Sequence, residues 1–157
     1  MCLIVDTCCL AQLFDPGNGE HSNFLPVLNW VVSGRGRIIY GGSKYNKELR
    51  AAYKFLGIMT ELERKGRAIR MPEAQVNKLA ISIKRQVPDR KFNDEHLVAL
   101  VIASRCGVVC TNDRDAISYL KRPEFYRPHR LKKPKIYRSK HNHSLCSDRH
   151  LIGICLR

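Results

Sequence analysis

Residues 94–115 read DEHLVALVIASRCGVVCTNDRD and contain the pattern that decides the fold. Residues 94–105 predict the most apolar helix of the chain, and residues 108–111 predict a short buried strand. Asp113 and Asp115 lie two and four residues after that strand. An apolar helix that leads into a buried strand ending in carboxylates is expected of a parallel sheet, because polar groups collect at the carboxyl ends of its strands.

The rest of the chain up to about residue 120 continues this alternation of strands and helices. Strands are expected at residues 2–5, 37–40 and 68–71, and helices at residues 8–14, 22–33, 44–56, 72–86 and 113–120. Because most of the connections are short, the pattern predicts an α/β fold, a three-layer α/β/α sandwich on a mainly parallel central sheet. Residues 1–125 are expected to form this domain, and residues 126–157 a basic C-terminal extension packed on or flanking it.

Composition and charge narrow the class of partner. The 157 residues suit one ordinary domain, and 28 Lys and Arg against 14 Asp and Glu leave a net charge of +14, which favours a polyanionic partner. Residues 121–157 alone hold 11 basic and two acidic residues. The longest apolar run, residues 97–103, is far shorter than the roughly 18 residues of a membrane span, so no membrane partner is expected. The opening MCLIVD does not resemble a signal peptide, which makes the cytoplasm the expected location.

Acidic side chains follow the two segments that are most typical of strands. Asp6 follows residues 2–5 and Asp113 follows residues 108–111, whereas Asp94 stands at the start of the apolar helix. Carboxylates that meet at one edge of a parallel sheet repel one another unless a cation neutralises them. Oxygen ligands suit Mg²⁺ or Mn²⁺, so Asp6, Asp94 and Asp113 are predicted to bind one of these ions. Each of Asp94, Asp113 and Asp115 could instead serve only to cap a helix.

Taken in order, these residues resemble the PIN domain, a nuclease fold of prokaryotic toxins and of eukaryotic RNA-processing factors. The likeness rests on the strand that ends in Asp6, on an acid in a helix after the second strand, on the helix that begins at Asp94, and on the segment VVCTNDRD. The resemblance implies a catalytic set of four acids and a fifth, auxiliary one: Asp6, Glu48, Asp94, Asp113 and Asp115.

The same resemblance implies a function and partners. It implies a Mg²⁺- or Mn²⁺-dependent endoribonuclease that cleaves the phosphodiester bonds of RNA, with Thr111 and Asn112 at its polar positions. Many members are toxins of toxin–antitoxin pairs, so an antitoxin or a second copy of the chain is a possible partner. Glu61 or Glu63 could take the place of Glu48, which could instead cap its helix or pair with a neighbouring lysine.

The basic tail is predicted to contact RNA. Basic residues interleaved with Tyr126 and Tyr137 suit a surface that follows the RNA backbone and stacks a base or two. The expected contacts are Lys132, Lys133, Lys135 and Arg138. Residues 141–155 hold five histidines and cysteines, residue types that bind zinc: His141, His143, Cys146, His150 and Cys155. Their spacing matches no standard zinc motif, so they could instead be surface residues followed by an apolar edge strand at 151–155.

A second interpretation keeps the predicted fold but assigns no catalytic activity to the chain. On this view the chain is a catalytically silent PIN-like module that binds RNA or takes part in an assembly. The two interpretations differ in one property, because only the nuclease is expected to bind Mn²⁺ through its acids.

Overall fold

The computed structural model describes residues 2–147 and contains a five-stranded sheet that is parallel throughout, in the order β3-β2-β1-β4-β5. This confirms the predicted α/β fold. The strands are β1 (Cys2–Val5), β2 (Arg37–Gly41), β3 (Ala68–Met71), β4 (Val108–Cys110) and β5 (Lys135–Tyr137).

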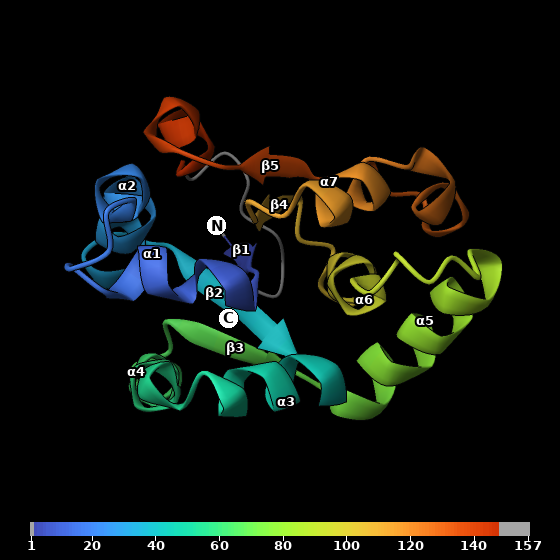
Figure 1. The fold of residues 1–157 in the computed structure, drawn as a ribbon, viewed down its shortest axis with the longest axis horizontal. Coiled ribbons are helices and arrows are strands. Elements are labelled where there is room, and N and C mark those ends of the chain that lie inside the picture. Colours follow the sequence, from blue (N-terminus) through green and yellow to red (C-terminus); the bar gives the residue numbers. More distant parts are fainter. Residues whose placement is uncertain (1, 148–157) are drawn as a thin grey trace.

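Helices cover both faces of the sheet. Figure 1 shows α1 and α2 on one side of the strands, and α5 and α6 on the other. The α-helices are α1 (Leu10–Phe14), α2 (His21–Val32), α3 (Ser43–Ala51), α4 (Tyr53–Arg64), α5 (Glu73–Gln86), α6 (Glu95–Ser104) and α7 (Arg114–Leu120). Short 3₁₀ helices are η1 (Thr7–Cys9), η2 (Pro123–Phe125), η3 (Arg127–His129) and η4 (Lys140–Leu145). Within residues 2–147, no helix has both the length and the apolar character needed to cross a membrane.

The core is built on β1 and α6. Every residue of β1 is buried, and so are residues 96–102 of α6. A helix that is apolar around its whole circumference must be covered on all sides, and α6 lies between the sheet and α5. The stretch that decides the fold therefore forms the centre of the molecule.

The predicted helix over residues 44–56 is wrong, because the chain forms two helices there. The backbone leaves helical geometry at Ala52 (φ −88°, ψ 47°), between α3 and α4. One continuous helix would have buried Leu56 on the face of Tyr45 and Leu49. The break shifts the phase by one residue, so Phe55 is buried and Leu56 is 38% exposed.

The sequence pattern did not predict β5, which lies in the segment expected to be a C-terminal extension. Residues 135–137 pair with β4, Lys135 with Val108 and Tyr137 with Cys110, and so complete the sheet of the domain. A strand of three residues is too short for periodicity to reveal. The suggested edge strand at 151–155 lies outside the described residues.

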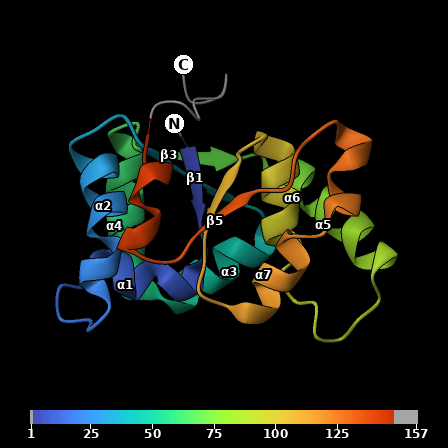
Figure 2. The ribbon, with the colours of Figure 1, turned by 90° about the horizontal axis from the view of Figure 1, so that it is seen from above.

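The strand order contains one topological switch point. The chain passes from β1 to β2 and β3 on one side, then returns to place β4 and β5 on the other side of β1. Crossovers diverge at such a switch point, here between β1 and β4, and ligands of open α/β sheets bind beyond the carboxyl ends of the strands there. Figure 2 shows that α1, α3 and α7 gather at the edge to which β1 points.

Candidate active site

Asp6 lies at the switch point and is tied to both central strands. It directly follows β1, and its backbone N–H donates to the Cys110 carbonyl at the end of β4 (2.9 Å). Its side chain is buried; Oδ2 accepts the Thr111 hydroxyl (2.7 Å) and Oδ1 accepts the backbone N–H of Cys8 (3.4 Å). These contacts hold a carboxylate, 5% exposed, in one orientation.

The turn after β2 brings α3 close to Asp6. Gly41 adopts a φ of 137°, and a Cβ at this position would lie 2.7 Å from the Met71 carbonyl oxygen, so the turn needs glycine. Tyr45, in the first turn of α3, donates its hydroxyl to the Val5 carbonyl (2.7 Å). This buried hydrogen bond fixes α3 against the end of β1.

Glu48 lies one helical turn beyond Tyr45. Its Oε2 accepts the hydroxyl of Thr7, the residue after Asp6 (2.7 Å). Burial raises the pKa of Glu48, and the charges of Asp6 and Glu95 raise it further; the Thr7 hydrogen bond and the positive charge of Lys44 oppose these effects. Glu48 is therefore an acid at the switch point, held near Asp6.

Asp94 joins the same group from the start of α6. It is the N-terminal cap residue, yet its side chain makes no capping hydrogen bond, so capping alone does not explain it. Burial raises the pKa of Asp94 to about 6, and the negative charges of Asp6, Asp113 and Glu48 add to this effect, whereas Lys44 opposes it. The negative charges of Asp6, Asp113 and Glu48 therefore act on Asp94, although burial is the larger effect.

Asp113 has two roles. Its Oδ1 accepts the backbone N–H groups of Asp115 (2.7 Å) and Ala116 (3.2 Å), which caps α7, and its own N–H donates to the Thr111 hydroxyl (3.1 Å). The Thr111 hydroxyl therefore links Asp113 to Asp6. Asp115 is exposed on the first turn of α7, and no hydrogen bond within residues 2–147 joins its carboxylate to the other acids.

The other two glutamates considered for the catalytic set lie elsewhere. Glu61 pairs with Arg64 (2.8 Å) and Lys65 (3.2 Å) on α4. Glu63 pairs with Arg70 (2.9 Å) and accepts the Tyr40 hydroxyl (2.7 Å). The structure therefore brings Glu48, and neither alternative, to Asp6.

Three residues outside the predicted catalytic set lie beside this group. Lys44 forms an ion pair with Glu95 (3.2 Å), and Nε2 of His96 lies 3.6 Å from Oε2 of Glu48. Burial and the charge of Lys44 lower the pKa of His96 to about 3, so the ring is neutral at pH 7 and its contact with Glu48 is not an ion pair. The position of Lys44 near the acids could have been predicted from the sequence, because Lys44 follows the carboxyl end of a strand, as Asp6 does.

The predicted RNA contacts divide between two edges of the sheet. Asn112 and Arg138 lie at the carboxyl edge, beside the acids, and line a polar pocket of about 470 Å³ with Glu20, Ser139, His141 and Asn142. Lys135 pairs with Val108 at the beginning of β4, so it lies at the amino edge, and Lys132 and Lys133 precede it. The structure therefore places Arg138 at the carboxyl edge, where the strands that precede Asp6 and Asp113 end, and the three lysines at the amino edge.

The carboxylate oxygens of these acids suit a hard cation that is bound by few protein ligands. Within residues 2–147, no three His, Cys, Asp or Glu side chains form a ready cage for a metal ion. Mg²⁺ is usually held by one or two carboxylates, several waters and substrate phosphates, and does not need such a cage. The burial of Asp94 and the negative charges that act on it are the observations that agree with a cation. Of the proposed zinc ligands, His150 and Cys155 lie outside the described residues.

Comparison of the chain with models of known protein families, with curated proteins and with solved structures found no match.

Proposed function

We propose that this chain is a Mg²⁺- or Mn²⁺-dependent endoribonuclease of the PIN type, which hydrolyses phosphodiester bonds of RNA. One observation carries the proposal. Four acids from four separate segments share the carboxyl edge at the switch point, and their mutual repulsion contributes to the raised pKa of Asp94. A protein of net charge +14 that gathers acidic side chains at one edge of its sheet is suited to bind a cation there and a polyanion around it.

The residues have distinct roles in this proposal. Of Asp6, Asp94 and Asp113, one or two carboxylates at a time would bind the metal ion directly, together with water molecules, and Glu48 would complete the acidic charge. A bound divalent ion acidifies a water molecule and stabilises the departing oxygen of a phosphodiester. The hydroxyls of Thr111 and Thr7 keep Asp6 and Glu48 in place through their 2.7 Å hydrogen bonds.

The polar pocket beside Asn112 supports RNA as the substrate. Arg138 supplies a guanidinium group suited to a phosphate, and the pocket adds amide and hydroxyl groups. An RNA backbone phosphate bound here would place the neighbouring nucleotides next to the acids. The three lysines at the amino edge provide a second cationic contact for a longer strand.

Cleavage of a labelled single-stranded RNA with Mn²⁺ tests the proposal. Wild-type protein is expected to cut, and Asp6→Asn to reduce the rate by about 100-fold or more, because it removes a charged ligand without changing the size of the side chain. Glu124→Gln is the matched control, since it changes the net charge equally at an exposed residue of η2. Absence of cutting by the wild type, or full activity of Asp6→Asn, would rule out the metal mechanism.

Calorimetric titration with Mn²⁺ separates the nuclease from a silent RNA-binding module. The nuclease is expected to bind Mn²⁺ with an affinity that falls in Asp6→Asn. RNA binding without acid-dependent Mn²⁺ binding would instead support the silent module.

The toxin role is a further part of the proposal, taken from the family resemblance. Growth arrest on expression of the wild type, relieved in Asp6→Asn, would support it. Unimpaired growth with active, folded protein would argue against it.

A further inference from the structure

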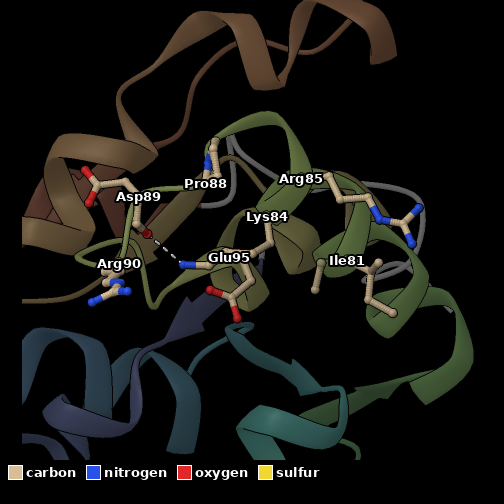
Figure 3. A pocket seen from close by; sticks show the side chains of 8 residues that line it. Ile81, Lys84, Arg85, Pro88, Asp89, Arg90 and Glu95 are labelled. Carbon is tan, nitrogen blue, oxygen red and sulfur yellow. Dashed lines mark hydrogen bonds between the residues drawn. The ribbon is translucent and has the colours of Figure 1, made fainter.

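A second pocket lies next to the acids, between α5 and the start of α6. This α5–α6 pocket has a volume of about 540 Å³ and is lined by Ala80, Ile81 and Arg85 of α5, by Pro88 and Arg90 of the connecting loop, and by Glu95. Figure 3 shows Arg85 and Arg90 on opposite sides of it. Ile81 is 55% exposed, so an apolar wall faces the solvent.

The other charged groups of this pocket are already engaged. Lys84 donates to the backbone carbonyls of Asp89 (2.8 Å) and Phe92. The Asp89 carboxylate accepts the Tyr119 hydroxyl (2.6 Å) and the backbone N–H of Lys91 (2.9 Å). Glu95 is paired with Lys44.

Arg85 and Arg90 remain available on the rim. Within the described residues, neither guanidinium group forms an ion pair with a carboxylate. The pocket therefore combines an apolar wall with two arginines that make no ion pair within the described residues, which suits a flat apolar ring attached to an anion.

The position of the pocket connects it to the candidate active site. Glu95 lines the pocket and directly follows Asp94, and its partner Lys44 influences the pKa of both Asp94 and Glu48. The polar pocket that contains Asn112 and Arg138 lies beyond β4. A strand bound across the acids would thus have a polar pocket on one side and an apolar, cationic pocket on the other.

We propose that the α5–α6 pocket binds one nucleobase of the RNA strand, with Ile81 against the face of the base, and with Arg85 and Arg90, on opposite sides of the pocket, each facing a different phosphate of the strand. This inference rests on the proposed function, because it specifies how the same site holds its substrate. Because the base is bound through stacking and apolar contact with its face, the pocket accepts any base. It favours purines, which have the larger face.

NMR titration of ¹⁵N-labelled protein in EDTA tests this binding without cleavage. The probes are the four nucleoside 5′-monophosphates, with ribose 5-phosphate as the ligand that lacks a base. The nucleotides are expected to shift amide signals within residues 80–95, and ribose 5-phosphate to bind at least about fivefold more weakly. Equal binding of ribose 5-phosphate, or shifts confined to other residues, would overturn the proposal.

A matched pair of variants locates the contact. Ile81→Ser is expected to raise the Kd of adenosine monophosphate by about fivefold, because it removes the apolar wall. Val32→Ser serves as the control, since Val32 is 54% exposed and lies on α2. Equal effects of both changes, or none of Ile81→Ser, would refute the assignment.

Cleavage measured separately with Mn²⁺ distinguishes the two proposals. Nucleotide binding in this pocket by a protein that does not cut RNA would support the nucleobase site and refute the proposed nuclease activity. Cleavage of RNA without nucleotide-induced shifts in residues 80–95 would support the nuclease activity and refute the nucleobase site.

Discussion

Replacing Asp94 by Asn is expected to make the metal-free protein more stable. The pKa of Asp94 rises from 3.8 to about 6 on folding, first through burial and then through repulsion by Asp6 and Asp113. That difference corresponds to about 3 kcal/mol. Asp94 is only half-buried, so solvent screening reduces the expected gain to about 1–2 kcal/mol at pH 7.5. The amide loses no capping bond, because the Asp94 side chain makes none.

The dependence on pH has a definite sign. Because the pKa is higher in the folded chain than in the unfolded chain, charging Asp94 opposes folding. The penalty is absent below about pH 4, grows as the pH rises, and is complete above about pH 6. Asp94→Asn should therefore equal the wild type in stability near pH 4 and exceed it at pH 7.5.

Urea denaturation in EDTA, followed by the fluorescence of the single tryptophan, Trp30, measures this difference. The control Glu124→Gln should stay within about 0.5 kcal/mol of the wild type. Added Mn²⁺ should stabilise the wild type and leave Asp94→Asn unchanged. A variant that is no more stable than the wild type at pH 7.5, or one that gains as much at pH 4, would refute the electrostatic reasoning.

Three further predictions concern the surroundings of the acids. Tyr45→Phe should lower the free energy of unfolding by about 1–2 kcal/mol, since it leaves the buried Val5 carbonyl without its hydrogen bond; unchanged urea denaturation would contradict this. Asp113→Ala should lose about 1 kcal/mol through the missing cap of α7, whereas Asp113→Asn should retain stability and lose Mn²⁺ binding, as denaturation and calorimetry would show. Changing Lys132, Lys133 and Lys135 together to Ala should weaken RNA binding and make its salt dependence shallower. An unchanged salt slope would show that the amino edge does not contact RNA.

Much of the candidate site was predictable because it depends on strand ends. A run of buried residues followed by Asp6, and another followed by Thr111 and Asp113, places these side chains at one edge once the strands are parallel. The start of α6 at Asp94 was equally visible, because the apolar run begins just after it.

Other features depend on tertiary contacts that leave no local pattern. No glycine or proline stands at Ala52, so the sequence does not predict a helix break there. Because of the break, Phe55 is buried in place of Leu56. The ion pair of Lys44 with Glu95 joins residues 51 positions apart, so only the packing of α3 near α6 creates it. Strand β5 is defined by pairing with β4, because three residues show too little alternation to be recognised.

The hydrogen bond between Asp6 and Thr111 spans 105 positions of the chain. During synthesis from the amino terminus, β1 is complete long before β4 has left the ribosome, so a growing chain has the first acid of the site and none of its partners from β4 and α7. Contacts of such high sequence separation form only after slow long-range closure. If the chain is the nuclease proposed above, the nascent chain would stay inactive on the ribosome and on its messenger RNA until Asp113 had emerged.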